Sequence, residues 1–142
     1  MKKRIHISDE GGTREFGLTL AGKLKAGDIV ALVGDLGTGK TALTKYIGEG
    51  LSVKEEITSP TFTIINEYKS GRLPLFHFDA YRLDDEDEML ELGYEEYFFG
   101  SGVTVVEWAD KVAGLIPGDS TVITISYGEK EFERIYDVHS GF

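Results

Sequence analysis

The chain has 142 residues, of which 41% are hydrophobic and 28% charged, proportions that are typical of a globular protein and exclude a disordered one. It contains no cysteine, which excludes disulfide scaffolds, thiol catalysis and cysteine zinc sites. The 15 Lys and Arg against 25 Asp and Glu give a net charge of −10, which disfavours DNA or RNA binding by the chain alone. No signal peptide or membrane span is recognisable, so we expect a cytoplasmic protein without membrane contact. The length fits one domain over residues 1–142.

Predicted strands and helices alternate along the chain. In chain order, the hydrophobic pattern predicts a strand at 4–7, a helix at 10–24 with Phe16, Leu20 and Leu24 on its buried face, a strand at 29–33, a helix at 40–51, a hairpin of strands 62–65 and 75–78, an acidic helix at 84–93, a helical turn at 94–99, a strand at 103–106 and a final hairpin of 122–127 and 132–138. The run Ile29–Val33 does not alternate with polar residues, which suits a strand buried on both faces. This order predicts an α/β fold, a three-layer sandwich of the P-loop NTPase kind with a mainly parallel sheet and antiparallel additions.

The clearest chemical signal is the segment Gly34-Asp35-Leu36-Gly37-Thr38-Gly39-Lys40-Thr41, which matches G-x-x-x-x-G-K-[ST] in full. Glycines let the backbone curl so that successive N–H groups point at phosphate oxygens, and the helix that follows presents its positive end to the same anion. Lys40 is expected to reach the β- and γ-phosphates, and Thr41 to offer a hydroxyl to Mg²⁺. The segment follows a predicted strand and opens a predicted helix, as a phosphate loop requires.

The nucleotide is expected to be ATP. GTPases normally read guanine through an N-K-x-D segment, and the only asparagine here, Asn66, is followed by Glu67. The guanine-reading segment is therefore missing from this sequence.

Hydrolysis also needs carboxylates that fix Mg²⁺ and orient water, and such acids usually end a buried strand beside the loop. Asp79 and Glu107 both hold that position, after 75–78 and 103–106. From the residues alone, either one is the metal ligand and the other the water-orienting group. Ser59 lies in the region from which P-loop switches take a hydroxyl that senses the γ-phosphate.

Five segments in this order resemble the TsaE (YjeE) family: G-D-L-G-T-G-K-T, S-P-T-F-T-I-I-N-E-Y, F-H-F-D-A-Y-R-L, E-L-G-Y-E-E-Y and V-V-E-W-A-D. The resemblance spans roughly residues 10–127. It implies a small P-loop ATPase that works with a TsaD–TsaB heterodimer in making threonylcarbamoyladenosine at position 37 of tRNA. The tRNA contact would be indirect, and hydrolysis by the chain alone would be weak and stimulated by its partners.

The resemblance also implies roles for individual residues. Residues 35–41 would bind ATP, Thr41 and Glu107 would hold Mg²⁺, and Asp79 would be needed for hydrolysis. The remaining implied residues are Thr61 as a switch-like hydroxyl, Trp108 near the nucleotide, Glu10 and Thr13 near the base, and Asp110 in the same pocket. Many members carry a second threonine after the loop, where this chain has Ala42.

Two other functions fit a phosphate loop. A small-molecule kinase would use it to transfer phosphate to an acceptor, although a chain of 142 residues leaves little room for an acceptor pocket and lid. A nucleotide-gated binding module would bind ATP without turning it over.

Overall fold

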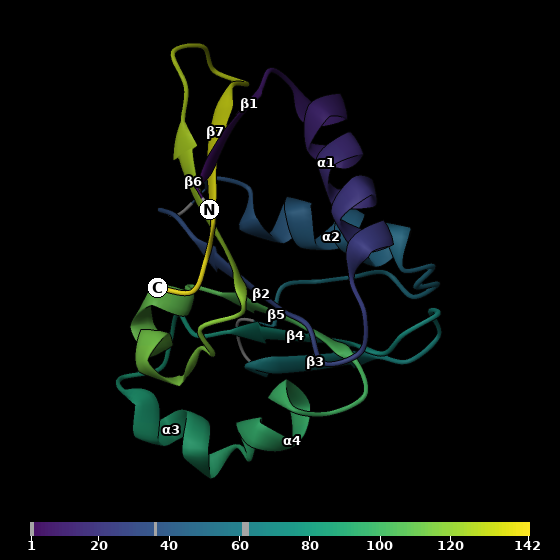
Figure 1. Ribbon diagram of the computed structural model, residues 1–142, viewed down its shortest axis with the longest axis vertical. Helices are drawn as coiled ribbons and strands as arrows, with labels where there is room; N and C mark the ends of the chain where they lie inside the picture. Colours follow the sequence, from purple (N-terminus) through teal and green to yellow (C-terminus); the bar gives the residue numbers. More distant parts are fainter. Residues whose placement is uncertain (1, 36, 61–62) are drawn as a thin grey trace.

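A mixed β-sheet forms the centre of the molecule. The structure, a computed structural model, describes residues 2–35, 37–60 and 63–142. These residues form one sheet of seven strands in the order β1-β7-β6-β2-β5-β4-β3 (Figure 1). The strands are β1 (Lys3–Ile7), β2 (Ile29–Val33), β3 (Ile65–Tyr68), β4 (Leu75–Asp79), β5 (Val103–Glu107), β6 (Thr121–Tyr127) and β7 (Arg134–Ser140).

The middle of the sheet is parallel. Strands β6, β2, β5 and β4 run in one direction, whereas β1, β7 and β3 pair antiparallel at the two sides. Every residue of β4 and β5 is buried, because helices cover both faces and leave no solvated side for polar residues to alternate with. The predicted α/β class, with its parallel centre and antiparallel additions, is therefore confirmed.

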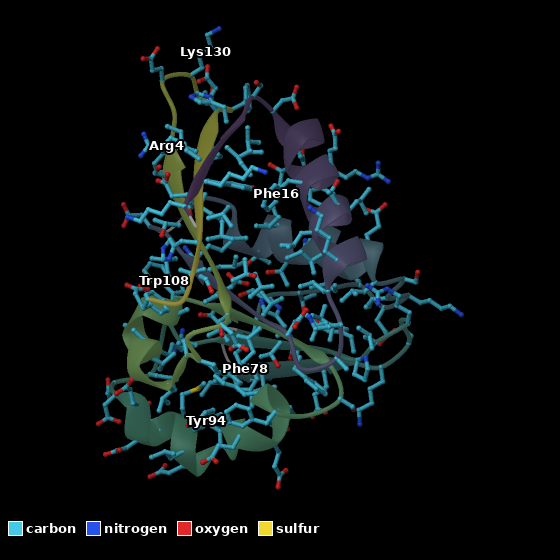
Figure 2. All side chains as sticks on the ribbon, in the orientation of Figure 1. Arg4, Phe16, Phe78, Tyr94, Trp108 and Lys130 are labelled. Atoms are coloured by element: carbon cyan, nitrogen blue, oxygen red, sulfur yellow. The ribbon has the colours of Figure 1, made fainter. Side chains whose placement is uncertain are left out.

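Helices form a layer on each face of the sheet. In Figure 1, α1 (Glu10–Lys23) and α2 (Lys40–Gly50) lie on one side, and α3 (Glu86–Glu91) and α4 (Tyr94–Phe98) lie on the other. The 3-10 helix η1 (Ala109–Leu115) packs with α3. Each layer buries its own apolar cluster against the sheet, and Figure 2 shows Phe16 within the first layer and Phe78 and Tyr94 within the second. No helix of the described residues is long and apolar enough to cross a membrane.

The predicted face of α1 packs on the core, with Leu24 buried and Phe16 and Leu20 packed against the cluster, but small residues form its most buried part. Thr13, Gly17 and Ala21 are its buried residues, whereas Phe16 and Leu20 are only partly buried. The reason is its close packing on α2: Gly17 meets α2 so closely that an added Cβ would lie 2.6 Å from Tyr46 Cβ. The large side chains flank this crossing, and Phe16 packs edge-on against Tyr136, with ring centroids 5.0 Å apart.

Two further expectations need correction, and one helix was not predicted. Of the strand predicted at 62–65, residue 62 lies outside the described residues, and β3 starts at Ile65, because the backbone turns at Ile64 with a φ of +69° before the strand pairs with β4. The acidic helix predicted at 84–93 is shorter, because Asp85 caps α3 by accepting a hydrogen bond from the Glu88 N–H. Helix η1 has no counterpart in the prediction.

Candidate nucleotide-binding site

The glycine loop lies between the end of β2 and the start of α2, as predicted. Gly37 and Gly39 have φ values of +82° and +101°, a region that residues with side chains rarely adopt. A Cβ on Gly34 would lie 2.6 Å from the Ile125 carbonyl oxygen on β6. The tight curl and the close approach to the sheet therefore both require glycine.

The side chain of Lys40 lies inside the loop. Its side chain is only 5% exposed, and Nζ donates hydrogen bonds to the carbonyl oxygens of Gly34 at 2.7 Å and Asp35 at 2.8 Å. Nζ also lies 4.1 Å from the centre of the Trp108 ring, a cation–π distance. Burial lowers the pKa of this ammonium, and nearby carboxylates, Glu107 foremost, act in the opposite direction. A buried cation is therefore held inside the loop.

Thr41 and Glu107 connect the loop to the neighbouring strand. The Thr41 hydroxyl donates to Glu107 Oε1 at 2.9 Å, with Oε2 at 3.1 Å. Glu107 ends β5 and is 3% exposed. Asp79 ends β4 directly opposite it in the parallel register and is 5% exposed, and its Oδ1 accepts a hydrogen bond from the Tyr81 N–H at 2.9 Å. The two predicted acids therefore lie side by side at the carboxyl edge of the sheet.

A hollow of about 310 Å³ opens over these groups. Tyr81 and Trp108 form one wall, with ring centroids 4.9 Å apart. The hollow is lined by Gly37, Gly39, Lys40, Thr41, Ala42, Ser59, Asp79, Tyr81, Glu107 and Trp108. It is therefore walled by the groups that phosphate binding needs, namely glycine backbone, an ammonium, a hydroxyl and carboxylates.

A second hollow of about 200 Å³ adjoins the first, sharing Gly39 and Ala42 in its lining. Glu10 and Thr13, the residues that the resemblance places near the base, both line it. The far wall comes from the β6–β7 hairpin and β7 and consists of Phe132, Arg134 and Tyr136. Arg134 fixes that wall to the loop, because its Nε donates to the Thr38 carbonyl at 3.1 Å.

The structure places the other predicted residues less centrally. Asp110 is exposed at the start of η1 and lines neither hollow, although its carboxylate is among those that raise the pKa of Lys40. Asp35 is exposed and accepts at its carbonyl from the Thr38 hydroxyl at 2.8 Å. Leu36 and Thr61 lie outside the described residues.

The sequence did not single out the β7 wall of the second hollow. Phe132, Arg134 and Tyr136 are distant in sequence from Glu10 and Thr13, and only the pairing of β7 with β1 brings them together. An aromatic–Arg–aromatic alternation on a predicted hairpin was the one available signal, and it is equally typical of an ordinary half-buried strand.

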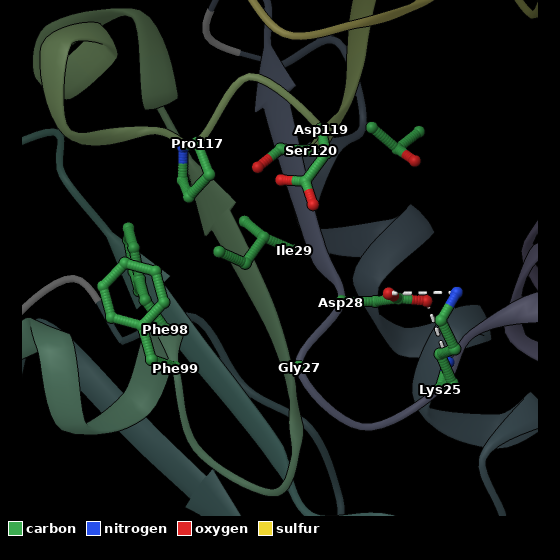
Figure 3. A pocket seen from close by; sticks show the side chains of 10 residues that line it. Lys25, Gly27, Asp28, Ile29, Phe98, Phe99, Pro117, Asp119 and Ser120 are labelled. Carbon is green, nitrogen blue, oxygen red and sulfur yellow. Dashed lines mark hydrogen bonds and ion pairs between the residues drawn. The ribbon is translucent and has the colours of Figure 1, made fainter.

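Another hollow, of about 280 Å³, lies at the opposite edge of the sheet. Figure 3 shows it between Phe98 and Phe99 on one side and Asp119 and Ser120 on the other, with Ile29 at the start of β2. It contains none of the predicted site residues, which gather at the carboxyl ends of the parallel strands.

The donor set at the loop fits magnesium. Mg²⁺ prefers oxygen ligands and usually takes one or two from the protein, with phosphates and water supplying the rest. The Thr41 hydroxyl and the Glu107 carboxylate are two such oxygen donors in contact with each other. Among the described residues, no group of three His, Cys, Asp or Glu side chains forms a metal cage of its own. The residues therefore suit an ion that arrives with a nucleotide.

Comparisons with known proteins identify a family. The family model described as "Threonylcarbamoyl adenosine biosynthesis protein TsaE" matches residues 7–136. The tRNA threonylcarbamoyladenosine biosynthesis protein TsaE of Bacillus subtilis (strain 168) is 47% identical over 113 residues, covering 80% of this chain and 70% of its own length. The protein of the same name from Nostoc sp. is 40% identical over 131 residues, covering 89% and 80%. The crystal structure of Bacillus subtilis YdiB has a TM-score of 0.85 at 34% identity and covers 100% of this chain and 87% of that one. The chain belongs to the TsaE family.

Proposed function

We propose that this chain is a single-domain ATP-binding and ATP-hydrolysing subunit of the machinery that makes threonylcarbamoyladenosine at position 37 of tRNA. The observation that carries the proposal is the hydrogen bond from Thr41, at the phosphate loop, to the buried carboxylate of Glu107 beside Lys40. Family membership supports the pathway, because the family and the two relatives above are named for threonylcarbamoyladenosine biosynthesis.

The loop would bind the phosphates of ATP. Lys40 is desolvated and already aimed into the loop, so it would exchange its bonds to two carbonyl oxygens for bonds to phosphate oxygens. Thr41 and Glu107 would hold Mg²⁺, which supplies charge neutralisation on the β- and γ-phosphates when bound. Asp79, fixed by the Tyr81 N–H beside Glu107, would orient the attacking water.

The second hollow would take the adenosine end of the nucleotide. It adjoins the phosphate hollow at Gly39 and Ala42, and the start of α1 contributes Glu10 and Thr13 to its wall. Trp108 would lie against the phosphate side, next to Lys40. Thr61 is proposed as the hydroxyl that senses the γ-phosphate, on the resemblance alone.

The partner would be a protein, the TsaD–TsaB complex, with tRNA reached only through it. A net charge of −10 supports this division of labour, because a chain with an excess of acids repels the phosphates of free tRNA. Docking on the complex would stimulate an otherwise weak ATPase, and the reaction would take place in the cytoplasm.

The test separates binding from hydrolysis. Asp79→Asn and Glu107→Gln keep side-chain size but remove one carboxylate each. Asp79→Asn should lower ATP turnover in the presence of the partners by at least about 100-fold, the scale of a lost general acid or base, and Glu107→Gln should lower it through weaker Mg²⁺ binding. Asp79→Asn should still bind ATP. Turnover is followed as labelled phosphate release, with urea unfolding as the control for folding.

Two outcomes would contradict the proposal. Normal turnover in both variants would refute the site, and label recovered in a small acceptor rather than in inorganic phosphate would identify a kinase. A third outcome, full tRNA modification by an Asp79→Asn variant that cannot hydrolyse ATP, would identify a nucleotide-gated binding module instead.

A further inference from the structure

His77 is a buried histidine next to the proposed magnesium ligand. It lies in the middle of β4, with Asn66 of β3 and Val105 of β5 as its Cα neighbours, and it is 0% exposed. Residues two apart on a strand point to the same side, so His77 and Asp79 face the same layer. His77 belongs neither to the phosphate loop nor to the acidic residues of the site.

The imidazole makes a polar contact with the site. Its Nε2 contacts Oε2 of Glu107, whereas its Nδ1 is buried and has no hydrogen-bond partner among the described residues. A buried polar nitrogen without a partner costs free energy, and an apolar side chain would fill the same space without that cost. The benefit of a histidine at this position therefore lies in its bond to Glu107.

Glu107 is held from two directions as a result. Thr41 donates from the side of the loop, with Oε1 as the nearer oxygen, and His77 Nε2 lies on Oε2 from the side of β4. Because a carboxylate oxygen accepts and does not donate, the proton of this contact belongs to His77 Nε2. Because the imidazole contacts Oε2, Oε1 is the carboxylate oxygen that remains nearer to Thr41 and free of the imidazole.

We propose that His77 is a positioning residue that fixes the orientation of Glu107 toward the Mg²⁺ of the bound nucleotide. This inference rests on the proposed function, since it assigns His77 to the same magnesium site. Hydrogen-bond partners of metal ligands set ligand orientation, and their loss typically weakens metal affinity by about 10- to 100-fold. His77 would touch neither nucleotide nor metal.

The test compares nucleotide affinity with and without magnesium. Fluorescence of Trp108, the only tryptophan, reports ADP binding first in EDTA and then in Mg²⁺, and the ratio of the two affinities measures the magnesium contribution. His77→Leu should reduce that ratio by about 10- to 100-fold, while ADP affinity in EDTA stays within about twofold, because the loop amides and Lys40 are untouched.

Two amide variants give a matched pair. The amide nitrogen of His77→Gln reaches the place of Nε2 and should restore most of the ratio. The amide of His77→Asn is equally polar but reaches only the place of Nδ1, so it should behave like His77→Leu. Phe98→Leu, in the apolar cluster on the other helical layer, serves as a control that lowers stability without touching the site.

The outcomes are distinguishable. A full magnesium contribution in both His77→Leu and His77→Asn would overturn the inference and leave the proposed function standing. Equal loss in His77→Gln and His77→Asn would also overturn it, because a space-filling role would not discriminate between them. Absence of ADP binding by the wild-type chain would instead refute the proposed function itself.

Discussion

The ammonium group of Lys40 lies in a buried place that disfavours its charged form. Burial lowers the pKa of its ammonium, so the charged form is less stable in the folded chain than in water. We predict that Lys40→Met, which keeps the length of the side chain, weakens ADP affinity by about 10- to 100-fold, the value of a hydrogen bond to a charged group. The free energy of unfolding should stay within about 1 kcal/mol of the wild type, because the two lost hydrogen bonds are offset by the lost desolvation. Calorimetric titration and urea unfolding measure the two quantities.

The pH dependence has a definite sign. A lysine whose pKa is lower in the folded than in the unfolded chain leaves the unfolded chain with more bound protons between the two pKa values. The contribution of Lys40 to stability therefore rises with pH as the pH passes through the lowered pKa toward the ordinary lysine value. Lys40→Met should lack this alkaline gain. A loss of several kcal/mol at neutral pH in this variant would mean that Lys40 mainly supports the fold.

At the scale of elements, the crossing of α1 and α2 positions the start of α1 beside the loop. Gly17→Ala would place a Cβ 2.6 Å from Tyr46 Cβ, so we predict a loss of about 1–3 kcal/mol of unfolding free energy from overpacking. Gly22→Ala is the matched control on the same helix, because nothing lies within 4 Å of its added Cβ. It should stabilise the chain by roughly 0.5–1 kcal/mol through helix propensity. Urea unfolding of both variants checks the pair, and equal effects would contradict the packing explanation.

The elements also show what could be predicted from the sequence. The path from β2 through the loop into α2 was predicted because its signals are local: an apolar run, glycines at positions that need positive φ, and a helix start. The predicted start of β3 was wrong because the register of this strand depends on its pairing with β4. The pairing begins at Ile65 and leaves the turn at Ile64. The contact of His77 with Glu107 needed two strands in parallel register, which spacing along the chain does not give.

The whole molecule joins distant parts of the chain at one place. The two hollows share Gly39 and Ala42, and their walls come from α1, the loop, the ends of β4 and β5, and the β6–β7 hairpin. The hairpin is tied to the loop by Arg134, whose guanidinium also lies 4.8 Å from the Tyr127 ring. A nucleotide that fills both hollows would therefore contact both helices of one layer and three separate strands, so its binding is expected to stabilise the fold globally.

This expectation gives a thermal prediction. A ligand that binds only the folded chain, at about 100 times its Kd, adds about 2.7 kcal/mol to the free energy of unfolding. For a chain of this size that corresponds to a rise of roughly 5–10 °C in Tm. MgADP should therefore raise the Tm of the wild type and of Gly22→Ala equally, and should raise that of Lys40→Met by about half as much or less at the same concentration, because its affinity is about 10- to 100-fold weaker. If calorimetry shows the same rise in Tm for Lys40→Met as for the wild type, the nucleotide binds away from the loop. The hollow of Figure 3, at the other edge of the sheet, would then be the first place to look for it, because it shares no residue with the two hollows beside Lys40.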